Sequence, residues 1–266
     1  MSEPETTPTG APDEPVRVEE DERRVVVTLQ RPQARNAIDL ATVARLHSVC
    51  EALERRPKIL VITGSGDMFA AGADLRELRE RTREDALEGI NSSLFDRLRR
   101  LPMPTIAAVN GPALGGGAEL AYACDFRLAT PVARFANPEV SLGILAAAGA
   151  CWRLRELVGE PLANEMLLAG RQLDAAEAFA AGLVNELVEP EALTGRVEAL
   201  IDDILRGAPL ALRLTKLALR TPESAHPAFD NVAQAVLFET ADKRERITAF
   251  LERPASGRPP APEAPQ

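Results

Sequence analysis

Apolar and polar residues follow two different periods in the first part of the chain. Apolar residues alternate with polar ones through much of residues 16–30, and the acidic triplet at 20–22 interrupts them, which predicts a β-hairpin that turns at the triplet. Over residues 39–55 the apolar positions recur every three to four residues behind Asp39, a residue type that favours helix N-caps. This second spacing predicts an amphipathic helix.

Further along the chain, short apolar runs alternate with longer amphipathic ones. Residues 58–64 and 105–110 are mostly apolar and predict buried strands, with a helix between them over about 84–101. Two more short strands are expected within 125–136. From Arg153 onward the pattern is mainly helical. The sequence therefore predicts an α/β fold followed by a helical region.

The two ends of the chain differ in composition from the rest. Proline, alanine and acidic residues dominate them, and such segments bury too little apolar surface to fold. We therefore expect a disordered acidic tail over 1–14, a folded core over 15–195, a helical region over 196–252 and a disordered Pro/Ala-rich tail over 253–266.

Composition and charge narrow the class of protein. Of the 266 residues, 45% are hydrophobic and 27% are charged, as in globular proteins, and the formal net charge is −9. We expect no binding to nucleic acid or membranes, because the charge is acidic and no apolar run reaches the roughly 18–20 residues of a membrane helix. Residues 1–24 hold eight acids and three arginines, more than half of the net charge, so the remainder does not exclude an anionic ligand.

Cysteine and histidine are scarce. Cys50, Cys124 and Cys151 are widely spaced, and the two histidines, His47 and His226, complete no zinc-binding spacing with them. We expect no metal site, reduced cysteines in the core and a packed, structural role for His47. A cytoplasmic location without a signal or transit peptide is also expected.

The most informative segment is a glycine turn that opens a helix. Gly115, Gly116 and Gly117 precede Glu119, and glycines let the backbone approach a ligand closely with free N–H groups. Such a turn suits an anionic oxygen, whereas the Lys-Ser/Thr pair of a P-loop and the GxGxxG spacing are missing from this segment. A tight turn between packed elements is the alternative interpretation.

A second segment of small residues precedes the glycine turn. Residues 69–75 read Phe-Ala-Ala-Gly-Ala-Asp-Leu and lead into a helix. Small side chains again allow a close approach, so each segment can supply one N–H to the same oxygen, which is the minimal oxyanion hole. The alternative here is an ordinary loop that ends in an aspartate N-cap.

Together these segments resemble the enoyl-CoA hydratase/isomerase (crotonase) superfamily. The likeness covers about 16–253 and is carried by FAAGADL at 69–75, NGPALGGGAEL at 110–120, FANPEVSLG at 135–143 and LLAGRQLDAAEAFAAGLVNELV at 167–188. The resemblance implies a crotonase-like spiral of ββα units with a C-terminal helical trimerisation region. We accordingly expect a homotrimer or a hexamer.

The resemblance also implies a reaction. Backbone N–H groups of Ala73 and Gly116 match the oxyanion hole, and Glu119 and Glu139 match the two glutamates of hydratases. The implied activity is syn addition of water to a 2-trans-enoyl-CoA, giving a 3-hydroxyacyl-CoA, in fatty-acid β-oxidation. We expect Glu139 to give a proton to the α-carbon and Glu119 to act as the base that anchors the water.

Further residues match positions that hold the substrate in that family, with the arginines near the CoA phosphates. The positions expected to bind acyl-CoA are Arg35, Ala71, Asp74, Leu75, Arg76, Gly115 and Ala147. The CoA thioester is the substrate, and the resemblance implies neither cofactor nor metal.

The turn after Gly143 departs from the family pattern. Ala146 and Ala147 stand where hydratases have proline and glycine, and Cys151 and Trp152 stand where they have threonine and glutamine. The Ala147 N–H is expected to help hold the water. We expect Trp152 to be a core anchor, with a place in the acyl site as the alternative.

The altered turn leaves two alternative functions open. One is an enoyl-CoA isomerase or another CoA-ester reaction, which would follow if the turn displaced the water. The other is a non-catalytic acyl-CoA-binding protein. Retention of both glutamates favours the hydratase over either.

Overall fold

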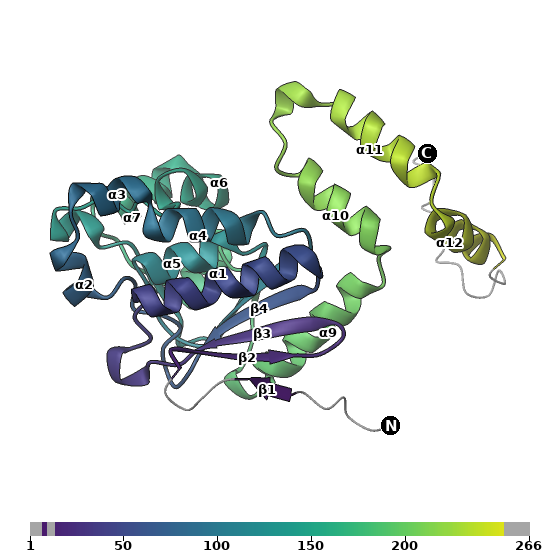
Figure 1. The fold of residues 1–266 in the computed structure, drawn as a ribbon. Helices are drawn as coiled ribbons and strands as arrows, with labels where there is room; N and C mark the ends of the chain where they lie inside the picture. Colours follow the sequence, from purple (N-terminus) through teal and green to yellow (C-terminus); the bar gives the residue numbers. More distant parts are fainter. Residues whose placement is uncertain (1–6, 10–13, 253–266) are drawn as a thin grey trace, which may run out of the picture. The chain divides into compact units, whose positions relative to one another are not determined.

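The computed structural model describes residues 7–9 and 14–252 (Figure 1). Most of the two expected tails therefore lies outside the described residues. The chain divides into two compact units, the first ending at Ile204 and the second starting at Leu205.

The first unit is built on a mixed β-sheet with the strand order β1-β2-β3-β4-β5-β7-β10. The first three strands are antiparallel, and the others run parallel to β3. Their bounds are β1 Thr7–Thr9, β2 Val16–Glu20, β3 Arg24–Leu29, β4 Ile59–Gly64, β5 Thr105–Val109, β7 Phe126–Ala129 and β10 Glu186–Leu187. The expected hairpin is confirmed, and β1 lies within the segment expected to be a disordered tail.

The parallel strands β4, β5 and β7 are mostly buried, as is usual for parallel strands whose faces are covered. In the register of the sheet, Val27 lies beside Ile62, and Ile62 lies beside Ala107. All three side chains are buried, as are all five residues of β5. The apolar runs predicted as buried strands are therefore confirmed.

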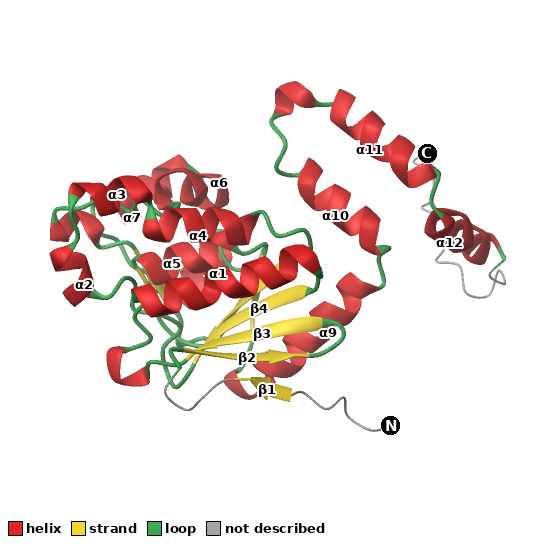
Figure 2. Cartoon of the chain, in the orientation of Figure 1, coloured by secondary structure: helices red, strands yellow, loops and turns green. Residues whose placement is uncertain are grey.

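Helices stack on the sheet in a connected layer. α1 (Leu40–Arg55) packs against α4 (Ile90–Arg99), which packs against α5 (Gly116–Ala123), and Figure 2 shows these helices on one side of the strands. Asp39 caps α1 as expected, since its carboxylate accepts a hydrogen bond from the Thr42 N–H at 2.7 Å. This layer carries α5, the helix opened by the glycine turn, into the core.

The single helix expected over 84–101 is wrong. This region forms two helices, α3 (Arg83–Glu88) and α4, separated by Gly89 at φ +65°. The helix expected to follow residues 69–75 is present as α2 (Leu75–Glu80). A left-handed residue ends a helix, and glycine adopts that conformation without a steric penalty. The break creates a wall of short elements beside the glycine turn.

A second, small sheet joins the two segments of small residues. It consists of β6 (Ala113–Leu114), β8 (Arg134–Ala136) and β9 (Leu173–Asp174), and an isolated bridge pairs Ala70 with Ala113. The remaining elements of this unit are a π-helical turn over Ala150–Leu154, α6 Arg155–Val158, α7 Glu160–Leu168, α8 Ala175–Ala180 and α9 Leu193–Leu205, whose last residue opens the second unit.

The second unit is helical. α10 (Pro209–Ala218) contacts α11 (Ala228–Phe238), and α11 contacts α12 (Ala241–Leu251). This unit leaves large apolar side chains exposed, among them Leu219 just after α10 at 83% and Val232 of α11 at 68%. Within the described part of the chain, no helix is long and apolar enough to cross a membrane.

The three cysteines and His47 differ in how deeply they are buried. Cys50 and Cys124 are buried, but Cys151 is exposed, so the expectation of a core position is wrong for Cys151. His47 is half-buried, and its Nδ1 lies 3.3 Å from the guanidinium of Arg97. Over residues 7–9 and 14–252, no cluster of three His, Cys, Asp or Glu side chains could hold a metal ion.

Candidate active site

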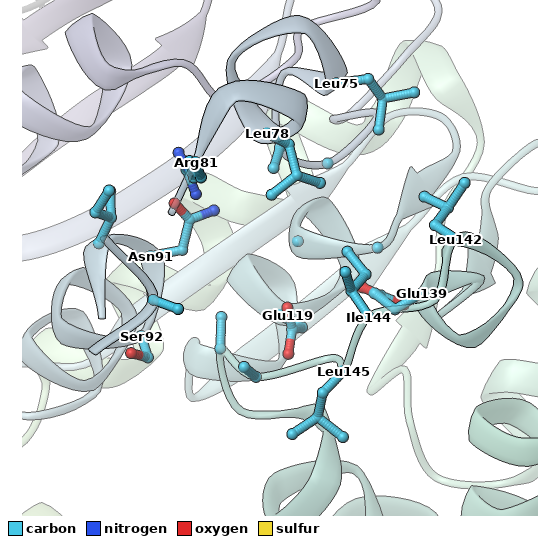
Figure 3. A pocket seen from close by; sticks show the side chains of 18 of the residues that line it. Leu75, Leu78, Arg81, Asn91, Ser92, Glu119, Glu139, Leu142, Ile144 and Leu145 are labelled. Carbon is cyan, nitrogen blue, oxygen red and sulfur yellow. The ribbon is translucent and has the colours of Figure 1, made fainter. Parts of the chain in front are cut away.

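A cavity of about 550 Å³ in the first unit holds the residues that the motifs singled out (Figure 3). One wall comes from α2 to α4, one from the glycine turn and α5, and one from residues 138–148. Most lining side chains are apolar, as in small-molecule sites, and few polar groups face the space. The segments far apart in the sequence therefore meet around one cavity.

Close backbone packing brings the two small-residue segments together. A Cβ added at Gly117 would lie 2.2 Å from the Ala70 carbonyl oxygen, and one added at Gly72, where φ is +99°, would lie 2.8 Å from the Leu114 oxygen. A Cβ at Gly116 would lie 3.4 Å from the Ala73 nitrogen. Glycine is required at positions 72 and 117 because an added Cβ would overlap the facing backbone.

The backbone amides of Ala73 and Gly116 belong to residues that line the same cavity. Ile38 pairs with Ala73 through the N–H groups of Ile38 and Asp74, which leaves the N–H of Ala73 on the opposite side of its backbone. Gly116 is the first residue of α5, where an N–H has no acceptor inside the helix. Both residues line the cavity, so the arrangement fits the expected oxyanion hole.

Glu119 lies in the first turn of α5, and its side chain reaches the cavity although the residue is only 4% exposed. Its Oε1 accepts a hydrogen bond from the backbone N–H of Ala150 at 3.0 Å. Burial raises the pKa of Glu119 to about 7; the Ala150 hydrogen bond acts in the opposite direction, and the charge of Glu139 adds to the increase. This carboxyl group can therefore exchange a proton near neutral pH.

Glu139 begins the 3₁₀ turn Glu139–Leu142 and is 8% exposed. Its Oε2 is buried without a hydrogen-bond partner in the described structure. Burial raises its pKa as well, while the side chain of Asn137 favours the charged form. Figure 3 shows Glu119 and Glu139 at the same cavity. Two carboxyl groups with raised pKa values thus share one apolar space with the two amides.

The expected substrate-binding residues divide into two groups. Ala71, Leu75, Gly115 and Ala147 line the cavity. Among the described lining residues, the other three expected positions do not occur: Arg35, Asp74 and Arg76.

The three residues outside the cavity have other contacts. The carboxylate of Asp74 caps α2 through the Arg76 N–H at 3.0 Å and pairs with Arg31 at 3.1 Å. The side chains of Arg35 and Arg76 are exposed. Arg35, at φ +54°, accepts a hydrogen bond on its carbonyl from the Ala71 N–H. Arg35 thus supports the small-residue segment through its backbone.

The altered turn keeps a path that alanine can follow. Among the described non-glycine residues, only Arg35 and Asn36 have positive φ, so Ala147 needs no left-handed conformation. The positive φ in this part of the turn belongs to Gly149, at +138°. The N–H that reaches Glu119 belongs to Ala150, which sequence reasoning missed. The role of the Ala147 N–H in holding water stays a prediction.

Trp152 is not a core anchor, since it is 41% exposed. Its ring lies 4.8 Å from the Arg99 guanidinium carbon, and it lines a second cavity of about 420 Å³. Glu119, Ala147 and Ala148 line both cavities, so the second cavity adjoins the first beside Glu119. The alternative expectation, a place near the acyl site, fits this position better.

Two polar residues of the cavity were also missed. Arg81 and Asn91 line it, and each has buried polar atoms without a partner in the described structure. The only signal for Arg81 was its place in an arginine-rich segment after residues 69–75, which gave no reason to prefer it to its neighbours.

Comparison with known proteins gives consistent matches. The family model described as enoyl-CoA hydratase/isomerase matches residues 19–256. A short-chain-enoyl-CoA hydratase of Clostridium acetobutylicum is 38% identical over 245 residues, which cover 89% of this chain and 94% of that protein. A 2,3-dehydroadipyl-CoA hydratase of Escherichia coli is 38% identical over 242 residues, 89% of this chain and 95% of that protein.

Solved structures agree with the sequence matches. The crystal structure of an enoyl-CoA hydratase from Mycobacterium smegmatis superposes with a TM-score of 0.85 at 33% identity. The superposition covers 90% of this chain and 96% of the other. The likeness therefore includes nearly the whole of both chains.

Proposed function

The chain belongs to the enoyl-CoA hydratase/isomerase family, and from this membership we propose how its residues hydrate an enoyl-CoA. The family, the α/β fold with a helical C-terminal region and the hydratase activity expected from the sequence are confirmed by the comparisons. The acyl-CoA thioester is the substrate, and we place the reaction in fatty-acid β-oxidation.

The thioester oxygen binds between the amides of Ala73 and Gly116. Addition of water to the β-carbon moves charge onto that oxygen, which becomes an enolate. Two N–H donors that are fixed by close backbone packing stabilise this charge without having to reorganise. The support is the pair of available amides on one wall of the cavity.

The two glutamates carry out the proton transfers. In this proposal an ionised Glu119 anchors the water and takes its proton as the water attacks the β-carbon, and a protonated Glu139 gives a proton to the α-carbon. The hydrogen bond from Ala150 stabilises the ionised form of Glu119. Burial raises the pKa of both carboxyl groups, so each holds a proton more readily than a free glutamate does.

The mechanism uses only side chains, backbone N–H groups and water, so we propose that no cofactor takes part. Ala71, Leu75, Gly115 and Ala147 contact the acyl end, while the exposed Arg35 and Arg76 remain candidates for the CoA phosphates. Asp74 serves by capping α2.

A homotrimer or hexamer is the proposed assembly. The second unit leaves apolar side chains exposed along α10, α11 and α12, and exposed patches of this kind mark interaction surfaces. A cytoplasmic location stays a prediction.

The observation that carries the proposal is the meeting of two buried carboxyl groups with two available amides at one cavity. The test is the loss of the conjugated-thioester ultraviolet absorbance when the protein is mixed with crotonyl-CoA. Hydration by the wild type and its loss in Glu119→Ala support the proposal. Binding without turnover, or migration of the double bond of a 3-enoyl-CoA without hydration, would contradict it.

A further inference from the structure

Arg81 is half-buried and lines the cavity. Its Nε and Nη2 are shielded from water, and neither has a hydrogen-bond partner among the described residues. Buried N–H groups that lack an acceptor are costly, because nothing replaces the water molecules that would otherwise accept their hydrogen bonds. The two unsatisfied nitrogens therefore point to an anionic acceptor that is supplied from outside the chain.

The position of Arg81 is fixed by the turn between α2 and α3. Its N–H donates to the Leu78 carbonyl at 3.3 Å, and the next residue, Thr82, caps α3. The nearby carboxylate of Asp85 is already hydrogen-bonded to Thr82. Its Oδ2 accepts from the Thr82 N–H at 2.7 Å and from the Thr82 hydroxyl at 2.8 Å. The charge of Arg81 contributes to lowering the pKa of Asp85, but no ion pair joins the two side chains in the described structure.

Asn91 adds a second polar group to the same wall. Its Oδ1 is buried without a partner, and its Nδ2 lies 3.5 Å from where a Cβ on Gly116 would stand. Figure 3 shows Arg81 and Asn91 on the side of the cavity away from Glu139 and Leu142. The polar groups thus begin beside Gly116 and extend away from Glu139.

The anion in this space belongs to the acyl group. The phosphates of CoA are separated from the thioester by the whole pantetheine arm, whereas Arg81 shares a cavity of about 550 Å³ with the residues that hold the thioester oxygen. A guanidinium presents paired N–H donors that match a carboxylate.

We propose that Arg81 binds a terminal carboxylate on the acyl chain, so that the preferred substrates are 2-enoyl-CoA thioesters of dicarboxylic acids. This inference rests on the proposed function. Arg81 is then a specificity residue: it recognises the end of the chain and takes no part in the proton transfers.

The test compares three thioesters that share the same CoA. They are crotonyl-CoA, the mono-CoA thioester of trans-hex-2-enedioic acid and the ω-methyl ester of the latter. The wild type is expected to have the highest kcat/KM for the free acid. Because hydrogen bonds to charged groups contribute about 1.5–3 kcal/mol, Arg81→Met is expected to lower kcat/KM for the acid roughly ten-fold or more. Values for crotonyl-CoA and the ester should stay within about two-fold.

Two further variants make the comparison specific. Arg81→Lys keeps the charge and should restore part of the preference for the acid. Arg79→Met removes an exposed arginine from α2 that does not line the cavity, and it should leave all three values unchanged. Equal losses for all three substrates in Arg81→Met would overturn the proposal, since they would assign Arg81 to CoA or to folding.

A calorimetric measurement separates this inference from the proposed function. If the wild type does not hydrate crotonyl-CoA, the function fails, but the affinities for adipyl-CoA and hexanoyl-CoA can still be compared. Tighter binding of adipyl-CoA that is lost in Arg81→Met supports the carboxylate site. Equal affinities in the wild type would exclude it.

Discussion

The backbone N–H of Ala150 donates a hydrogen bond to the carboxylate of Glu119 at 3.0 Å, across 31 positions of the sequence. Ala150 opens the π-helical turn that follows Gly149, in the segment where this chain departs from its family. The altered turn therefore still reaches the carboxylate to which the proposal assigns the water. The unusual sequence changes the residues of the turn but leaves a donor for Glu119.

Neutralising either glutamate should reduce hydration strongly. Glu119→Gln and Glu139→Gln keep the size of the side chains but remove the groups that transfer protons, and general acid–base catalysis contributes roughly 10²–10⁴-fold. We expect kcat for crotonyl-CoA to fall by that amount in each variant. Glu160→Gln makes the same change at an exposed position of α7 and should have no effect. Full activity of Glu139→Gln would remove Glu139 from the mechanism.

The rate should depend on pH with a midpoint near neutrality. Burial raises the pKa of Glu119 to about 7, so the carboxyl group becomes protonated as the pH falls through that value. Only the ionised form accepts a proton, and kcat/KM for crotonyl-CoA should therefore fall by about ten-fold per unit below the midpoint. A pH–rate profile between 5 and 9 measures this limb. An acid limb near pH 4.5 would show that Glu119 is not the base.

Gly72 should tolerate no side chain. An alanine there would place its Cβ 2.8 Å from the Leu114 oxygen and 3.2 Å from the Gly116 nitrogen, at φ +99°. The clash would separate the two segments that supply the oxyanion donors, so we expect a loss of about 1–3 kcal/mol in unfolding free energy and a large loss of kcat. Urea unfolding and the crotonyl-CoA assay measure the two effects.

The matched control for that substitution is Gly66→Ala. Gly66 also has positive φ, at +70°, but no atom lies within 4 Å of its added Cβ. It should show only the backbone strain of about 1 kcal/mol and near-normal activity. If both variants lost activity equally, strain and not the contact with Gly116 would explain the result.

Gly149 should control the donor to Glu119. Its φ of +138° is unfavourable for alanine, although an added Cβ would meet only Trp152, at 3.9 Å. Gly149→Ala should therefore move the turn and weaken the Ala150 hydrogen bond, which lowers kcat and raises the pH midpoint set by Glu119. The control is Gly143→Ala, at φ +73° with open space around it. A pH midpoint in Gly149→Ala equal to that of the wild type would contradict this role.

Much of the fold and several residues of the candidate site were predicted from the sequence alone. The apolar periods determined the strands β3, β4 and β5 and the helix α1 with its Asp39 cap, because these depend on neighbouring residues. The two small-residue segments were identified from their glycine and alanine content, and the two glutamates were identified through the resemblance to the family.

Tertiary structure decided the rest, because burial and hydrogen bonding depend on residues far apart in the chain. Only the folded chain brings Ala150 to Glu119, leaves Trp152 exposed beside Arg99 and breaks the helix at Gly89. In the sequence Arg81 is one arginine among several, and its unpaired side chain gains meaning only from the cavity around it. The sequence thus identified the candidate catalytic residues, while the packing of distant segments determined their burial, the direction of their pKa shifts and the other groups that line the cavity.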